Sequence, residues 1–82
     1  MAIFKDYLIK GLYYVENGAS NCELWTEMMI SECGERMKPH LHYIMLFSFT
    51  MAYLRAGTNE KLKRNLSKEL KKIKKICKRQ AR

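Results

Sequence analysis

Lysine and arginine side chains in the last third of the chain are the residues whose type and spacing best suit binding chemistry. Residues 55–82 carry twelve Lys and Arg against two Glu, whereas residues 1–54 carry four basic and six acidic side chains, so the net charge of +8 arises entirely in the last third. Basic side chains that neutralise phosphates release condensed counterions, which gives affinity without any reading of bases. The pattern therefore predicts a nucleic-acid-binding surface. Its predicted contact residues are Lys61, Arg64, Lys68, Lys71, Lys72, Lys75, Lys78 and Arg79.

The other residues of this segment indicate which kind of nucleic acid it suits. Residues 55–82 contain no Phe, Tyr or Trp, whereas single-strand binders and RNA-recognition sheets stack bases on aromatic side chains. Asn and Gln are few and Lys far outnumbers Arg, so the side chains that usually pair with adenine and guanine edges are scarce. We therefore expect sequence-independent contact with a duplex backbone, with double-stranded RNA somewhat favoured over DNA.

A second hypothesis makes the same basic segment a docking element. Leu62, Leu66, Leu70 and Ile73 recur at helical spacing, and a basic amphipathic helix can dock on a membrane surface or in the groove of an acidic protein. This alternative leaves these four side chains partly exposed in the free protein. The sequence KKIKKICKR also has the loose composition of a nuclear-localisation patch.

Cysteine, histidine and glutamate side chains are candidates for other chemistry, but their spacing does not favour it. The cysteines and histidines nearest to one another form the pattern C-x10-C-x6-H-x-H, made of Cys22, Cys33, His40 and His42. This pattern lacks the close cysteine pair of structural zinc sites. The pairs of glutamates between residues 23 and 35 are typical of a solvated helix face. The chain has neither a glycine-rich phosphate loop nor a nucleophile elbow. We therefore expect no metal, no cofactor and no enzyme activity.

The cysteines and the apolar runs indicate the compartment. Three cysteines at irregular spacing are unlike the disulfide framework of a small secreted protein. Asp6 and Lys10 interrupt the N-terminal apolar stretch, which therefore lacks the uninterrupted core of a signal peptide. The most apolar run, residues 41–54, has 14 residues, whereas about 20 are needed to span hydrocarbon. These features predict an intracellular protein, cytoplasmic or nuclear, without a transmembrane segment.

The elements that must position the basic side chains are predicted to be helices. A chain of 82 residues forms one small domain at most. We expect a compact all-α bundle of three to four helices, with an apolar helical body at residues 1–57 and a basic C-terminal helix at residues 58–80. Apolar residues at steps of three and four mark each helix. The first three predicted helices span residues 2–16, 21–37 and 39–56, with a cap at Ser20 or Asn21 and a kink or short break near Pro39. The fourth is capped by Thr58 or Asn59 and reaches about Lys78.

The predicted fourth helix has two different faces. At about 100° per residue, its apolar side chains fall within an arc of about 120° and its basic side chains occupy about 180° of the remainder. Glu69 lies at the apolar arc, where we expect it to snorkel outward or to pair with Lys72 or Lys68. One side of the helix is therefore predicted to pack while the other stays cationic. The apolar arc comprises Leu62, Leu66, Leu70, Ile73, Ile76 and Cys77.

The predicted third helix is apolar around nearly its whole circumference, which suggests self-association. In a small monomer most helices keep one face in water, so some of this apolar surface is expected at a subunit interface. A twofold homodimer is the commonest solution, and it would pair two cationic helices. The candidate interface residues are Ile44, Met45, Phe47, Phe49 and Met51.

In size, charge layout and helix count, the chain resembles the compact helical dimers with which some RNA viruses sequester double-stranded RNA. Examples are the nodaviral silencing suppressors and the RNA-binding domain of the influenza non-structural protein. The resemblance implies a viral RNA-silencing suppressor that binds double-stranded RNA as a homodimer. It assigns no role to any individual residue, because no diagnostic motif of either family is present.

Overall fold

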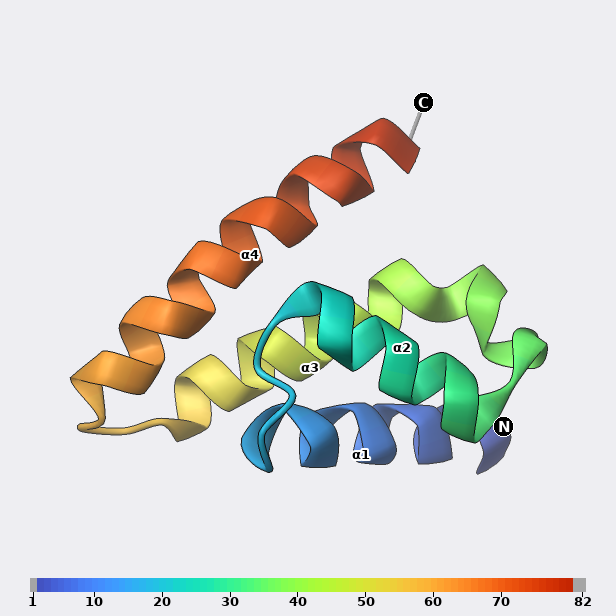
Figure 1. The fold of residues 1–82 in the computed structure, drawn as a ribbon, viewed down its shortest axis with the longest axis horizontal. Coiled ribbons are helices and arrows are strands. Elements are labelled where there is room, and N and C mark those ends of the chain that lie inside the picture. Colours follow the sequence, from blue (N-terminus) through green and yellow to red (C-terminus); the bar gives the residue numbers. More distant parts are fainter. Residues whose placement is uncertain (1, 81–82) are drawn as a thin grey trace.

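The computed structural model describes residues 2–80, with side chains at residues 4–79. Within this part all regular secondary structure is helical and there is no strand, which confirms the predicted all-α class. The described residues form four α-helices and one 3-10 helix, and Figure 1 shows how the α-helices are arranged. In chain order they are α1 (Ala2–Glu16), α2 (Cys22–Cys33), the 3-10 helix η1 (Glu35–His40), α3 (Leu41–Arg55) and α4 (Glu60–Gln80).

Asparagine side chains determine where two of the helices begin. The Asn21 side-chain oxygen accepts a hydrogen bond of 2.8 Å from the Leu24 N–H at the start of α2. Asn59 accepts one of 3.1 Å from the Leu62 N–H at the start of α4. A side-chain acceptor at this position satisfies an amide that has no partner within its own helix. Of the alternative caps in the sequence, the structure therefore uses Asn21 and Asn59.

The break between α2 and α3 lies earlier than the sequence predicts. The helix expected at residues 21–37 ends at Cys33, because Gly34 has a φ of 77° and its N–H donates to the Ile30 carbonyl at 2.8 Å. Glycine adopts this left-handed region without a Cβ penalty and often ends helices there. Pro39 lies inside η1 and does not itself form the break. The chain therefore turns at Gly34 and reaches α3 through a 3-10 segment.

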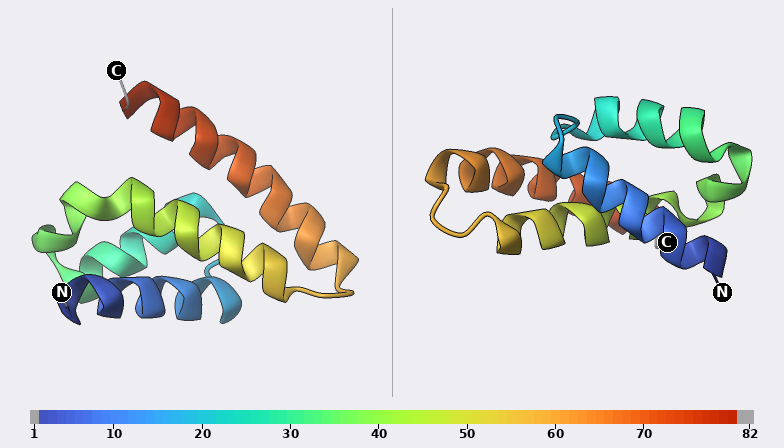
Figure 2. Two further views of the ribbon diagram at one scale, coloured as in Figure 1. Left: turned by 180° about the vertical axis from the view of Figure 1, so that it is seen from behind. Right: turned by 90° about the horizontal axis from the view of Figure 1, so that it is seen from below.

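Helix α3 is the element against which the others pack. It packs most extensively against α1 and α4 and also contacts α2 and η1. In the right-hand view of Figure 2, α2 runs along the upper edge, α3 and α4 lie side by side below it, and α1 descends across the molecule to the lower right. The core contains fully buried side chains from α2, α3 and α4, among them Trp25, Met29, Ile44, Phe49, Leu66 and Ile73.

A close approach of α1 to α3 organises this core around Trp25. The Trp25 indole N–H donates a hydrogen bond of 2.9 Å to the Gly11 carbonyl, and the indole packs edge to face on Phe49 with centroids 6.0 Å apart. A Cβ at residue 11 would collide with Ser48 Oγ and come within 3.1 Å of the indole. Only glycine therefore allows the two helices and the indole to meet at this distance.

Candidate nucleic-acid interface

One face of α4 is held against the body of the protein. Leu66 and Ile73 are fully buried, and Leu62, Leu70 and Cys77 are partly buried against the same core. These residues belong to the apolar arc identified in the sequence. Because α4 packs mainly on α3, its opposite face points away from the body. Figure 1 shows α4 as a separate diagonal element along one side of the molecule.

The opposite face of α4 carries the predicted contact residues. All eight predicted side chains are exposed, and so is Lys74. Four of them lie in one row along the helix, because they follow at steps of four, three and four residues: Arg64, Lys68, Lys71 and Lys75. The helix rises about 1.5 Å per residue. The full set from Lys61 to Arg79 then extends over about 27 Å. These residues are Lys61, Arg64, Lys68, Lys71, Lys72, Lys75, Lys78 and Arg79, and we call them the basic face.

Some basic side chains are engaged in contacts within the chain. Lys72 Nζ lies 3.4 Å from a carboxylate oxygen of Glu69, and the pKa of Lys72 is raised by this hydrogen bond and by the carboxylate charge. Lys63 lies over the Tyr53 ring, 5.9 Å from its centroid. The Arg55 guanidinium lies 2.8 Å from a carboxylate of α1. Among the residues that the structure describes, the seven other members of the basic face form no ion pair.

Glu69 explains how α4 is attached to α2. Its carboxylate accepts a hydrogen bond of 2.9 Å from the backbone N–H of Cys22, the first residue of α2, and is almost fully buried. A carboxylate at this position satisfies a free amide and complements the positive end of the helix dipole. Burial by itself raises the pKa of Glu69, but hydrogen bonds from Cys22 and Lys72 outweigh it and hold this pKa below its usual range. Glu69 therefore acts as a cap supplied by another helix.

The sequence identified only part of this role. It placed Glu69 at the apolar arc and offered Lys72 as a partner, and that ion pair is present. The contact with Cys22 was missed, because it joins residues 47 positions apart and has no local pattern. An acidic residue at the apolar face of an otherwise basic helix was the available signal.

Burial raises the pKa of the Cys22 thiol to about 12, with a further contribution from Glu69, so this thiol is a poor nucleophile.

A further contact holds the first half of α4. The Asn65 side-chain amide lies 3.3 Å from both the carbonyl and the hydroxyl oxygen of Ser20, in the segment between α1 and α2. Together with the buried Leu66 and Ile73 and with Glu69, it restrains the rotation of α4 about its own axis. The basic face is therefore presented in one orientation.

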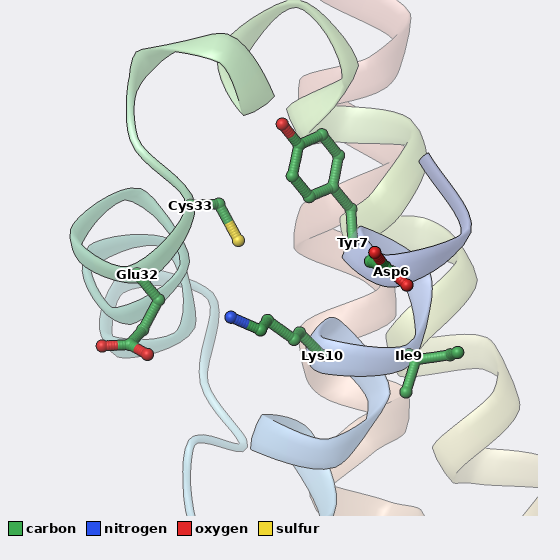
Figure 3. Close-up of a pocket in the computed structure, with 6 residues that line it drawn as sticks. All are labelled: Asp6, Tyr7, Ile9, Lys10, Glu32 and Cys33. Atoms are coloured by element: carbon green, nitrogen blue, oxygen red, sulfur yellow. The ribbon is translucent and has the colours of Figure 1, made fainter. Parts of the chain in front are cut away.

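Cys33 lies in a cleft that could suit other chemistry. The cleft has a volume of about 420 Å³ and lies between α1 and the end of α2, and Figure 3 shows the Lys10 ammonium pointing into it toward Cys33 and Glu32. Burial raises the pKa of the Cys33 thiol although the Lys10 charge opposes it, so the thiol is not activated. The His40 ring packs edge to face on the Phe4 ring, with 5.3 Å between the two ring centroids. Within the described residues, no three metal-ligating side chains come together.

The predicted dimer interface needs correction. Ile44, Met45 and Phe49 are at most 3% exposed within a single chain, so their assignment to a subunit interface is wrong. They face inward because Gly11 and Trp25 bring α1 and α2 onto this side of α3. Phe47 and Met51 remain partly exposed on its outer side.

Comparisons with protein-family models, with curated proteins and with solved structures found no match to this chain. Among residues 2–80, no helix combines the length and the apolar character needed to cross a membrane.

Proposed function

We propose that this protein is a non-enzymatic nucleic-acid-binding protein that binds duplexes through the basic face of α4. The binding has no sequence specificity, and double-stranded RNA is somewhat favoured over DNA. The observation that supports this most directly is a row of exposed cations on a helix whose other face is buried. Seven of the eight members of the basic face meet no carboxylate among the described residues. The partner that such a surface suits is a polyanion of regular charge spacing.

Charge repulsion along α4 gives the physical reason for such a partner. Like charges at three and four residues apart destabilise a helix by a few tenths of a kcal/mol per pair, and the basic face contains several such pairs. A phosphate backbone relieves this repulsion and releases counterions. At the rise of about 3.4 Å per base pair of B-form DNA, the roughly 27 Å of the basic face extend over about eight base pairs, and they extend over somewhat more in the A-form helix of RNA, which rises less per base pair.

The packing of α4 favours this proposal over docking on a membrane or in an acidic groove. Docking of that kind inserts the apolar stripe of the helix into the partner. Leu66 and Ile73 are fully buried in the free protein. The stripe therefore becomes available only if α4 leaves α3, whereas the basic face is available without any rearrangement.

The biological role that fits this binding mode is sequestration of double-stranded RNA by a homodimer, as in a viral silencing suppressor. A dimer would present two basic faces and contact about twice as many phosphates, which steepens the salt dependence. Such a protein would shield a long RNA duplex from a double-strand-specific ribonuclease in the cytoplasm or nucleus. Protection of the duplex at stoichiometric protein, with no cleavage by the protein itself, is the expected result.

The direct test is a titration of a short RNA duplex at several salt concentrations. If five or six cations contact phosphates, the logarithm of the association constant falls with the logarithm of salt with a slope of about −5. Lys71→Ala combined with Lys75→Ala should reduce the steepness of that slope by about two and weaken binding to all duplexes alike. The matched control is Lys5→Ala with Lys10→Ala, which removes the same charge from exposed positions of α1.

Several results would count against the proposal. An affinity that does not depend on salt would show that phosphates are not the ligand. Equal losses in the α4 variant and in the α1 control would show that only net charge matters. Tight binding to vesicles of anionic lipid, with weak binding to duplexes at the same salt, would favour the docking alternative.

A further inference from the structure

The outer side of α3 carries a row of uncharged side chains that the described residues of the chain leave partly or largely exposed. Tyr43 is 62% exposed and Leu54 is 66% exposed, and the four residues between them in the row are partly exposed. Five of the six line a shallow groove of about 280 Å³. The row is made of Tyr43, Leu46, Phe47, Thr50, Met51 and Leu54, and we call it the α3 stripe.

The α3 stripe lies on the opposite side of the helix from the core. The inward face of α3 includes Ile44, Met45, Ser48, Phe49 and Ala52, all buried. In the right-hand view of Figure 2, the last turns of α3 (yellow) lie on the lower side of the molecule, with α2 at the upper edge. A helix with apolar side chains on all sides is usually buried on all sides. A second surface is therefore expected to cover the α3 stripe.

We propose that a second copy of this chain covers the α3 stripe, with the two α3 helices antiparallel about a twofold axis. Charge supports this choice of partner. Residues 41–54 contain no Asp, Glu, Lys or Arg, so two copies meet here without like-charge repulsion. The basic face, in contrast, would repel itself in a chain of net charge +8.

The spacing of the stripe is complementary to itself in this arrangement. An axis placed between residues 48 and 49 brings every member of the stripe opposite another member. Tyr43 then faces Leu54 of the partner subunit, and Leu46 faces Met51 of the partner subunit. The bulky Phe47 faces the small Thr50 of the partner subunit, which allows the two helices to interdigitate. A twofold interface requires this kind of self-complementary patch.

The general size range of exposed apolar patches indicates how strong such a dimer is. Exposed apolar patches of about 300–600 Å² are the largest found on typical monomers and often serve function. Two copies that pair through a patch no larger than this bury at most about 600–1,200 Å² in total, which is at or below the lower limit of stable interfaces. We therefore expect a monomer and a dimer in equilibrium at micromolar concentrations or above, not a permanent dimer.

This interface adds a second copy of the chain as a partner in the proposed function. The role of the dimer in duplex binding rests on the proposed function, whereas dimerisation itself requires no nucleic acid. Two copies bound to neighbouring parts of one duplex have a high effective concentration for each other. A weak α3 interface would therefore form more completely on the duplex than in free solution. Self-association is best measured without nucleic acid, so that a failure of the interface leaves duplex binding to be judged separately.

The test is sedimentation equilibrium of the full chain over a wide concentration range, with charge introduced at residue 50. The wild type should change from 9.8 kDa toward twice that mass as concentration rises. In the proposed register, residue 50 and its counterpart are three residues apart along the axis, or about 4.5 Å. Thr50→Glu and Thr50→Lys should therefore each weaken the dimer at least tenfold alone, and an equimolar mixture of the two should dimerise again.

A control and a second variant make the outcome decisive. Ile9→Glu places the same charge on an apolar side chain of α1 that is 57% exposed, and it should leave the dimer unchanged. If circular dichroism shows that a residue 50 variant is unfolded, Leu54→Glu tests the same interface at a more exposed position. A wild-type mass of 9.8 kDa at every concentration, or a mixture that stays monomeric, would overturn the proposal. Stripe variants that lose binding to lipid vesicles and keep their oligomeric state would also overturn it.

Discussion

Replacing Glu69 by Gln tests the contact that joins α4 to α2. The change keeps the size of the side chain and an oxygen that can accept from the Cys22 N–H at 2.9 Å, but it removes the negative charge. A carboxylate near a helix N-terminus contributes about 0.3–1 kcal/mol through the helix dipole, and up to about 2 when partly buried. A charge-assisted hydrogen bond is also about twice as strong as a neutral one. We therefore expect Glu69→Gln to lower the free energy of unfolding by about 1–2 kcal/mol near neutral pH.

The pH dependence of this loss has a definite sign. Hydrogen bonds from Cys22 and Lys72 hold the pKa of Glu69 in the folded protein below its usual range despite burial, whereas in the unfolded chain it lies near the ordinary value of about 4.3. A group whose pKa is lowered by folding stabilises the protein fully above the unfolded value and loses this effect as pH falls through the folded value. The stability difference between wild type and Glu69→Gln should therefore shrink below about pH 4 and vanish at lower pH.

Urea unfolding of both proteins, followed by circular dichroism from neutral to acid pH, measures this difference. Glu27→Gln is the control, because Glu27 is exposed on α2 and such substitutions usually change stability by less than about 0.5 kcal/mol. A Glu69→Gln protein as stable as the wild type at neutral pH would refute the capping role. A difference that stays constant down to the lowest pH would show that the lost packing, and not the charge, is responsible.

Three further predictions use the same kind of reasoning. Gly11→Ala should lower the free energy of unfolding by about 1–3 kcal/mol, because a Cβ at residue 11 collides with the Ser48 hydroxyl. Ser48→Ala removes this buried hydroxyl, which has no hydrogen-bond partner among the described residues, and should restore part of that loss in thermal denaturation; no rescue would contradict the clash. Cys22, buried and with a thiol pKa raised to about 12, should react with a maleimide only when the protein unfolds, and labelling at the rate of an exposed thiol would contradict its burial. Lys72→Ala should change the salt slope of duplex binding less than Lys71→Ala, because a neighbouring carboxylate already neutralises it; equal changes would contradict this.

Periodicity and capping chemistry were sufficient to predict the four α-helices, but not the end of α2 or the 3-10 helix that follows it. The start of α4 at Glu60 and its asparagine cap follow from a local pattern that no tertiary contact overrides. The end of α2 was less predictable, since Gly34 and Pro39 both interrupt helices and the sequence does not say which one dominates. Gly34 does so because its positive φ ends the hydrogen-bonded series, whereas proline fits inside the 3-10 segment.

The orientation of α3 shows the limit of sequence patterns. Both of its faces are apolar, so hydrophobic periodicity does not determine which one meets the core. The choice depends on Gly11 and Trp25, which lie on other helices and bring α1 and α2 onto the side of Ile44 and Phe49. This dependence is why the expected interface included buried residues and omitted Tyr43 and Leu54, the most exposed members of the outer side.

The attachment of α4 and its charge are linked through Glu69. Its carboxylate neutralises Lys72 and caps α2 at the same time, so protonation of this single group has two opposite effects. The net charge of α4 rises by one, which strengthens attraction to phosphates, while the contact with α2 weakens and the orientation of the basic face becomes less restrained. Binding that depends on a fixed orientation should therefore weaken on acidification, whereas binding that depends on charge alone should strengthen.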